Sequence, residues 1–167
     1  ALVLAPGLAE ASYNRALSLE RTFDKKKAEA SYDRALAINP FLAQAWTNRG
    51  KLRQEAARFD QALKDHQTAL TLHPGLAEAV HNRATVLSER RDFEASIRAF
   101  RRAIRIWPDL ANAHLGLSMT LLMIGRYLEG WAESEWRFLD RQQNGVLAQS
   151  AAPRLTFEAL ASLNQKK

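Results

Sequence analysis

The apolar residues of this chain follow a pattern that repeats every 34 residues. Four prolines mark the period without an insertion or deletion between them: Pro6, Pro40, Pro74 and Pro108. A fixed period of this length is typical of repeat proteins, in which each unit buries its apolar face only by packing against its neighbours.

Each unit combines small residues with large apolar ones at fixed places. The small residues stand ten, 22 and, in the first three units, 29 positions after the proline: Ala16, Gly50, Ala84 and Ser118, then Ala28, Ala62, Ser96 and Gly130, then Ala35, Ala69 and Ala103. Small side chains let two helix backbones approach closely, and large ones fill the space beside the contact. Each unit therefore predicts a pair of antiparallel helices, at about 8–22 and 26–38, 42–56 and 59–72, 76–90 and 93–106, and 110–124 and 127–140.

The second full unit carries the residues that identify the repeat. Trp46, Gly50, Ala62, Ala69 and Pro74 resemble the tetratricopeptide repeat (TPR), a helix-turn-helix unit of 34 residues. The resemblance covers about residues 1–141 and implies an all-α, right-handed superhelix (α-solenoid) of four repeats. We place these repeats at about 7–40, 41–74, 75–108 and 109–141.

Both ends of the chain extend beyond these four units. Residues 1–5 have the phase of a second helix, so we expect a truncated N-terminal helix and an array that continues before residue 1. Asn144-Gly145 predicts a turn within a loop at 142–153, and 154–167 is interpreted as a C-terminal capping helix and tail. The segment 125–137 resembles the last repeat of bacterial TPR proteins that carry a glycosyltransferase-like domain, among them relatives of O-linked N-acetylglucosamine transferase.

Composition narrows the classes of function. The net charge of +6 permits an acidic partner without requiring one, and the lack of cysteine excludes disulfides and thiolate zinc sites. The longest mainly apolar run, 113–125, is too short for a membrane span, so we interpret the protein as cytoplasmic. The histidines, which we expect to be isolated and hydrogen-bonded, lack metal-ligand spacing: His66, His73, His81 and His114. We predict no metal, no cofactor and no catalytic site in this segment.

One column suggests a binding surface. Asn14, Asn48 and Asn82 lie eight residues after the first three prolines, on first helices, which line the concave face of a TPR array. Asparagine amides can both donate to and accept from a peptide backbone, and a similar ladder holds substrate polypeptide in the resembled transferases. The alternative is that these amides cap or bridge neighbouring helices.

Two sets of arginines are given structural interpretations. Arg15, Arg49 and Arg83 are expected to pack between helices and pair with carboxylates. The stripe on a second helix is expected to be a solvated face, in preference to a nucleic-acid site: Arg98, Arg101, Arg102 and Arg105.

The leading hypothesis is a protein-interaction scaffold that binds a protein or peptide segment in the concave groove. Neighbours of the asparagines are predicted to supply selectivity: Tyr13, Lys51, Glu78, His81 and Thr85. Of the residues that form the carboxylate clamp of Hsp90-binding TPRs, only the central asparagine is present here, which argues against that partner. The alternatives are the substrate-recruiting arm of a larger glycosyltransferase and self-association through the array ends.

The fourth unit differs from the others because its inward positions are apolar. We predict a patch formed by four residues: Leu115, Met119, Leu122 and Met123. Exposed apolar patches usually meet something, and residues 154–164 offer apolar side chains of their own. We therefore predict that this segment docks on the patch as a cap, in preference to an outside ligand.

Overall fold

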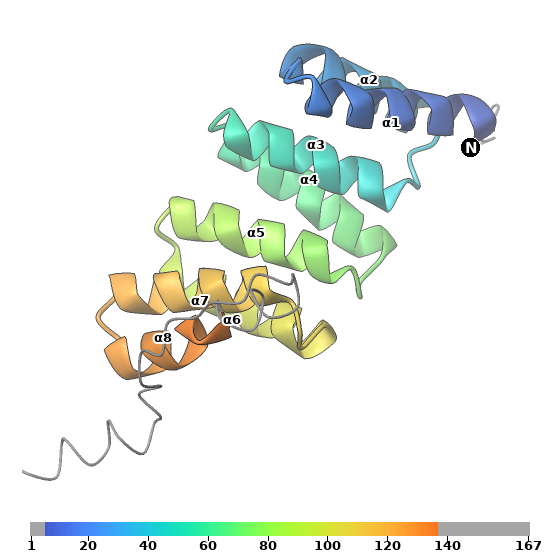
Figure 1. Cartoon of the computed structure of the whole chain (residues 1–167). Helices are drawn as coiled ribbons and strands as arrows, with labels where there is room; N and C mark the ends of the chain where they lie inside the picture. The colour runs from blue at the N-terminus through green and yellow to red at the C-terminus, as the bar shows by residue number, and fades with distance from the viewer. Residues whose placement is uncertain (1–5, 137–167) are drawn as a thin grey trace, which may run out of the picture.

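The computed structural model describes residues 6–136, and all the regular structure in that range is helical (Figure 1). The helices alternate with short turns in the order α1 (Pro6–Arg21), α2 (Lys25–Ile38), α3 (Ala43–Glu55), α4 (Phe59–Leu72), α5 (Ala77–Glu89), α6 (Phe93–Ile106), α7 (Ala111–Met123) and α8 (Tyr127–Ser134). The predicted all-α solenoid of helix-turn-helix repeats is confirmed.

Consecutive helices pack as pairs, and the pairs stack in chain order. The first helices, α1, α3, α5 and α7, follow one another down the side of the molecule that faces the viewer in Figure 1. Each second helix packs against its own first helix and against the first helix of the next pair, and α5 also contacts both α3 and α7. The first helices therefore form one continuous row.

The predicted helix ends agree with the structure to within two residues up to α7. The residues before the internal prolines leave the helical region: Asn39 has φ −134°, His73 −139° and Trp107 −136°. A proline disfavours helical backbone in the residue before it, so each second helix ends there. The predicted last helix, 127–140, begins at Tyr127 as expected, but α8 ends at Ser134; residues 137–140 lie outside the described range.

The turn inside each pair uses the same backbone conformation four times. Phe23, Ala57, Arg91 and Gly125 are 34 residues apart and have φ of 59°, 56°, 63° and 82°. This left-handed conformation is unfavourable for residues with a side chain, yet three of the four are not glycine. The helix packing on either side of the turn therefore imposes its geometry.

The small residues lie where the helices touch. A Cβ on Gly50 would lie 2.7 Å from the ring of His66 in α4, and one on Gly130 would lie 2.7 Å from Leu122. Ala62 and Ala69 are fully buried. These contacts explain why the small columns keep their period.

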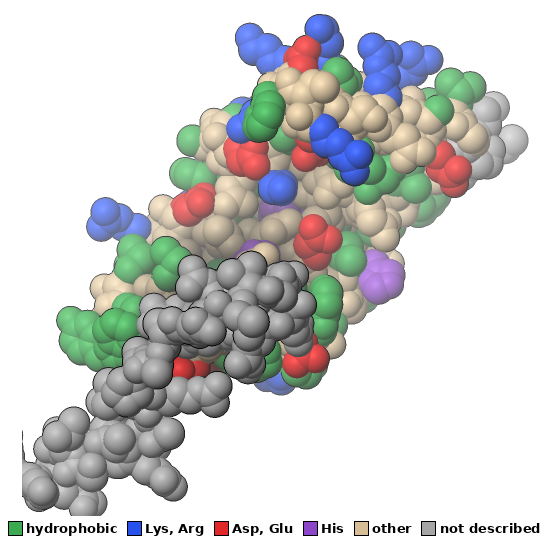
Figure 2. Space-filling model, viewed as in Figure 1, with side chains coloured by type: hydrophobic (Ala, Val, Ile, Leu, Met, Phe, Trp, Pro, Cys, Tyr) green, Lys and Arg blue, Asp and Glu red, His purple; other side chains and the backbone are tan. Residues whose placement is uncertain are grey.

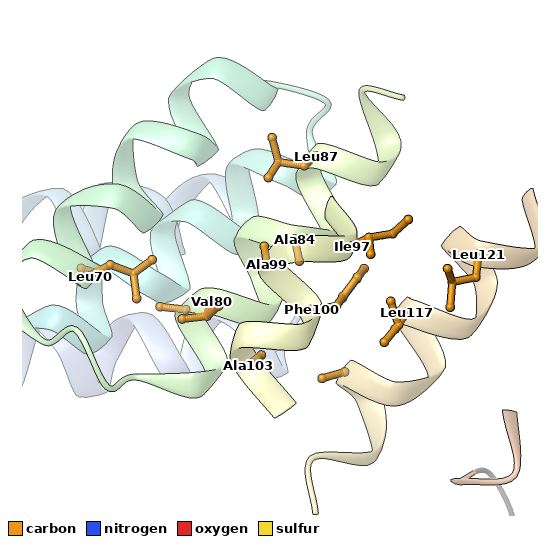
Figure 3. Packing of buried hydrophobic residues seen from close by; sticks show 13 residues of the cluster. Leu70, Val80, Ala84, Leu87, Ile97, Ala99, Phe100, Ala103, Leu117 and Leu121 are labelled. Atoms are coloured by element: carbon orange, nitrogen blue, oxygen red, sulfur yellow. The ribbon is translucent and has the colours of Figure 1, made fainter. Parts of the chain in front are cut away.

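The largest core cluster spans the middle and the end of the array. Figure 3 shows Leu70 of α4, Val80 of α5, Phe100 of α6 and Leu117 of α7 among the residues that meet there. This core joins α4 to α7 across two repeat junctions, and it holds the first helices in register with one another.

Three predictions concern residues near the ends of the chain. The truncated helix at 1–5, the loop at 142–153 and the capping helix and tail at 154–167 lie outside the described residues and stay predictions. No helix within 6–136 is both long and apolar enough to cross a membrane.

Candidate functional site

The exposed side of the first helices forms one surface. On each first helix, positions 4, 8, 11 and 15 after the proline share a face, because their spacing of four, three and four residues follows the helical period. We call this surface the first-helix face, and it consists of Glu10, Asn14, Leu17, Arg21, Gln44, Asn48, Lys51, Glu55, Glu78, Asn82, Thr85, Glu89, Asn112, Gly116, Met119 and Met123. All are exposed or half-buried, so a partner can reach the whole row.

The asparagine column lies on this face, and its members differ in their contacts. Asn48 Nδ2 donates to the Tyr13 hydroxyl oxygen at 3.2 Å, which bridges α3 and α1. The side chains of Asn14, which is exposed, and Asn82, which is half-buried, make no hydrogen bond to another described residue. Of the three asparagines, Asn48 alone bridges two helices within the described residues.

Tyr13 stands in a shallow cleft between α1 and α3. The cleft is lined by Glu10, Tyr13, Asn14, Leu42, Gln44 and Ala45. Behind it, the Tyr13 and Tyr32 rings lie 5.8 Å apart. Burial raises the pKa of the Tyr13 phenol, and the carboxylates of Glu78 and Glu20 raise it further against the opposing hydrogen bond from Asn48. Glu10 also contributes a carboxylate to the lining of this cleft.

The other residues predicted to select a partner differ in how far their side chains are exposed to solvent. Lys51 and Glu78 are exposed. Thr85 donates its hydroxyl to the His81 carbonyl oxygen at 3.1 Å, and the His81 ring tilts against Phe100 with 5.6 Å between ring centroids. His81 and Thr85 thus belong partly to the helix packing, whereas Lys51 and Glu78 face solvent.

The predicted apolar patch is smaller than expected. Met119 and Met123 are 66% and 62% exposed, and Leu115 is half-buried. Leu122 is half-buried as well, and its side chain packs against Gly130 of α8 inside the fourth helix pair. Exposed apolar side chains also occur on α8 itself: Tyr127, Leu128 and Trp131.

Arg49, one of the arginines predicted to pair with carboxylates, belongs to a buried network of ion pairs. Arg49 Nε and Nη2 donate to the Asp65 carboxylate at 2.9 and 2.7 Å, and Nη1 donates to Asp33 Oδ1 at 2.7 Å. The Arg49 guanidinium also lies 4.5 Å from the centre of the Trp46 ring. The expectation that an arginine packs between helices and pairs with carboxylates is confirmed at this position.

Arg53 extends the same network. Its Nη1 approaches the Asp65 oxygens at 3.0 and 2.8 Å, and its Nε donates to Glu29 Oε1 at 3.0 Å. Arg58 also pairs with Glu29. Three arginines and three carboxylates from α2, α3, α4 and the turn before α4 thus join the first two repeats. Arg15, which is exposed, and Arg83, which is half-buried, form no ion pair within residues 6–136.

Two of the four histidines are not satisfied, contrary to the prediction. His66 is fully buried, and neither of its ring nitrogens has a hydrogen-bond partner; His81 Nδ1 is buried and unpartnered as well. His114 fits the expectation, with Nδ1 2.5 Å from Glu133 Oε2 and Nε2 2.8 Å from the Pro108 carbonyl oxygen. The period explains His66, because it occupies the place of Tyr32 and Phe100, a site for a large ring.

The arginine stripe of α6 behaves as expected. Arg98, Arg101, Arg102 and Arg105 are all exposed. Arg101 pairs with Glu129 at 3.0 Å, and Arg102 donates to the Pro74 carbonyl oxygen at 3.0 Å. Within 6–136, no three histidine or acidic side chains lie close enough together to hold a metal ion.

Two parts of the site were missed from the sequence. Glu10 and Gln44 line the cleft four residues after their prolines, in the column that contains Glu78, so column analysis was sufficient to find them. The network partners Asp33 and Asp65 gave a weaker signal, because each column holds only one other acidic residue, Glu135 and Glu133 respectively, two or three repeats away.

The helix pairs and their 34-residue period define a helical repeat protein of the solenoid class. Family models described as "Tetratricopeptide repeat" match residues 9–42, 47–109 and 81–130. The chain belongs to the tetratricopeptide repeat family. No curated protein matches it.

Solved structures show the same fold. MamA 41-end from Desulfovibrio magneticus RS-1 has a TM-score of 0.72 at 18% identity, covering 81% of this chain and 77% of its own. The first TPR of Spaghetti (RPAP3), described as bound to HSP90 peptide SRMEEVD, has 0.71 at 15% identity over 74% and 98%. A Thermobaculum terrenum O-GlcNAc transferase mutant has 0.66 at 28% identity over 69% and 22%, so the match spans about a fifth of that enzyme chain.

The ion network generates a prediction about stability. Asp65 is 1% exposed and pairs with both Arg49 and Arg53, so Asp65→Ala leaves these arginines with only the more exposed carboxylates of Asp33 and Glu29 and is expected to cost about 3–5 kcal/mol in the free energy of unfolding. Asp60→Ala is the matched control: it breaks the exposed pair with Arg90 and is expected to cost less than about 1 kcal/mol. Urea denaturation measures both, and equal costs would contradict the assigned role of the network.

A second prediction concerns pH. Burial, with smaller effects from Arg83 and His81, lowers the pKa of His66 to about 4, below its usual 6.5. The unfolded chain therefore binds a proton that the folded chain excludes. The contribution of neutral His66 to the free energy of unfolding is therefore fully present above pH 6.5 and is lost as the pH drops toward 4. His66→Phe is expected to recover about 2 kcal/mol at pH 5 relative to pH 7.5.

Urea denaturation at the two pH values tests this expectation. His73→Gln removes an exposed histidine and should leave the pH dependence unchanged. Part of the dependence should survive in His66→Phe, because burial also lowers the pKa of His81. An identical loss of stability at pH 5 in His66→Phe and the parent protein would show that His66 does not cause it.

Proposed function

We propose that this array is a protein-interaction scaffold that binds an extended segment of a protein partner along the first-helix face. Asn14, Asn48 and Asn82 would contact the backbone of that segment. The observation that carries the proposal is the position of these amides at one place on three successive helices, with hydrogen-bonding groups that the described residues leave unused.

Amides at this position suit a backbone ligand. An extended segment presents N–H and C=O groups that need partners when it leaves water, and an asparagine side chain can satisfy one of each. A row of such amides binds without demanding particular side chains. Selectivity would then come from Tyr13, Lys51, Glu78, His81 and Thr85 beside the row.

The fourth repeat would bind a different part of the segment. At Gly116 the column lacks an amide, and the next positions on the face are Met119 and Met123, both well exposed. Methionine side chains adapt to irregular apolar surfaces. We therefore propose that the segment makes polar contacts with α1, α3 and α5 and places an apolar residue near α7.

The neighbouring structures support a peptide ligand but not a particular one. The Spaghetti (RPAP3) domain is described as bound to an HSP90 peptide that ends in acidic and apolar residues. In this chain the places that match the clamp hold Tyr13, Leu17, Asn48, Glu78 and Asn82, so only its central asparagine is present. The partner proposed here is accordingly not an acidic C-terminal tail of that kind.

A second candidate function is the substrate-recruiting arm of a glycosyltransferase. The similarity to the Thermobaculum terrenum O-GlcNAc transferase favours it. Full-length sequence separates the two candidates, because a nucleotide-sugar-binding domain downstream would identify the enzyme. In either case the first-helix face would hold polypeptide.

Replacing Asn48 and Asn82 tests the amide row. A peptide selected from a random 12-residue display library supplies the probe. Asn48→Ala with Asn82→Ala is expected to weaken its binding by about 1–3 kcal/mol, because backbone groups of the peptide lose their partners. Calorimetric titration measures binding, and thermal denaturation measures folding.

Gln67→Ala is the matched control for this experiment. It removes an exposed amide from α4, outside the first-helix face, and keeps both asparagines. We expect peptide affinity to change little in this variant, by no more than about 0.5 kcal/mol. Equal losses of affinity in the two proteins, or a double variant that loses as much stability as affinity, would instead assign the asparagines a structural role.

A further inference from the structure

The first-helix face has a charge opposite to that of the whole chain. The chain carries +6, yet this face holds four carboxylates, Glu10, Glu55, Glu78 and Glu89, against the two basic residues Arg21 and Lys51. Figure 2 shows acidic side chains distributed along the side of the molecule on which α1, α3 and α5 lie, with Lys and Arg side chains among them. The face is therefore locally acidic on a basic protein.

Two of these carboxylates have partners and two do not. Glu55 pairs with Lys25 at 2.9 Å, and Glu89 accepts from Gln54 Nε2 at 3.0 Å. Glu10 and Glu78 are exposed and make no ion pair or side-chain hydrogen bond with another described residue. Both act on the same place, since Glu10 lines the cleft and the charge of Glu78 raises the pKa of Tyr13 within it.

The cleft combines the groups that bind a cationic side chain. Glu10 provides the opposite charge, and the Tyr13 ring offers a π face, over which cations are attracted. Asn14 and Gln44 contribute amide oxygens that accept from N–H groups. Leu42 and Ala45 supply an apolar wall for the aliphatic stem of an arginine or lysine.

We propose that the cleft between α1 and α3 is a pocket for an arginine or lysine side chain of the bound segment. This inference rests on the proposed function and adds the charge of the partner to it. The segment would place its basic residue between Glu10 and Tyr13 and continue along the asparagine column toward Met119.

The exposed face of α6 does not offer the same site to a cation. Exposed basic side chains line α6, with Arg98, Arg102 and Arg105 among them. Like charges there repel a basic segment, whereas the cleft attracts it, so the two surfaces favour partners of opposite charge. The attraction between exposed charges also weakens with added salt.

Peptide arrays test the inference. Two pools of otherwise random 12-residue peptides are compared, one with a fixed central arginine and one with a fixed central glutamate. We expect the arginine pool to bind more strongly, and Glu10→Gln with Glu78→Gln to weaken it by about three- to tenfold, as expected for the loss of two exposed charge contacts. Glu94→Gln, which removes an exposed carboxylate from α6, should change neither pool.

The outcomes separate this inference from the proposed function. Binding that depends on Asn48 and Asn82 but does not distinguish the two pools would overturn the cationic pocket and leave the proposed function intact. If no peptide of either pool depends on those asparagines, both proposals are wrong. An arginine preference that survives Glu10→Gln with Glu78→Gln would also reject the pocket, because the charge would then be recognised elsewhere.

Discussion

Close contact between helix backbones at the small-residue columns is the constraint on which this structure depends. The ring of His66 lies only 2.7 Å from where a Cβ of Gly50 would be, and the other pairs have buried Ala16, Ala84 and Ser118 at the equivalent position. Because interiors are close-packed, even one added methyl group there is felt. Each pair consequently has the same geometry, and residues 34 apart in sequence line up on the first-helix face.

An arginine at the same position in successive repeats can nevertheless be paired with carboxylates in one repeat and lack them in the next. Arg49 is neutralised by Asp65 and Asp33, whereas Arg83, one repeat later, faces columns in which Ala99 and Gln67 replace those carboxylates. Beside it lie the unpartnered nitrogens of His66 and His81. The junction of the first two repeats is thus held by a satisfied ion network. The next junction, between α4 and α5, relies on apolar residues such as Leu70 and Val80, with buried polar groups that lower its stability.

The sequence predicted the fold well and the site in part, for a physical reason. Helix ends, turns and the asparagine column follow from local spacing, and a fixed period reports such features repeatedly. Contacts between helices do not follow from local spacing. Asp65 binds Arg49 from another helix, and the side chain of Leu122 packs against Gly130 of α8. Pairing partners of buried charges and the membership of a surface patch required the three-dimensional arrangement.

Mapping a bound peptide by NMR tests the central claim most directly, namely that the first-helix face is the binding surface. The measurement uses isotope-labelled protein and the peptide selected from the random library. We predict that amide resonances of the first helices shift on titration, with those near Asn14, Lys51 and Thr85 among the largest changes, while those near Arg98 and Arg102 of α6 stay unchanged. Shifts concentrated on α6, with α1, α3 and α5 unaffected, would contradict the account.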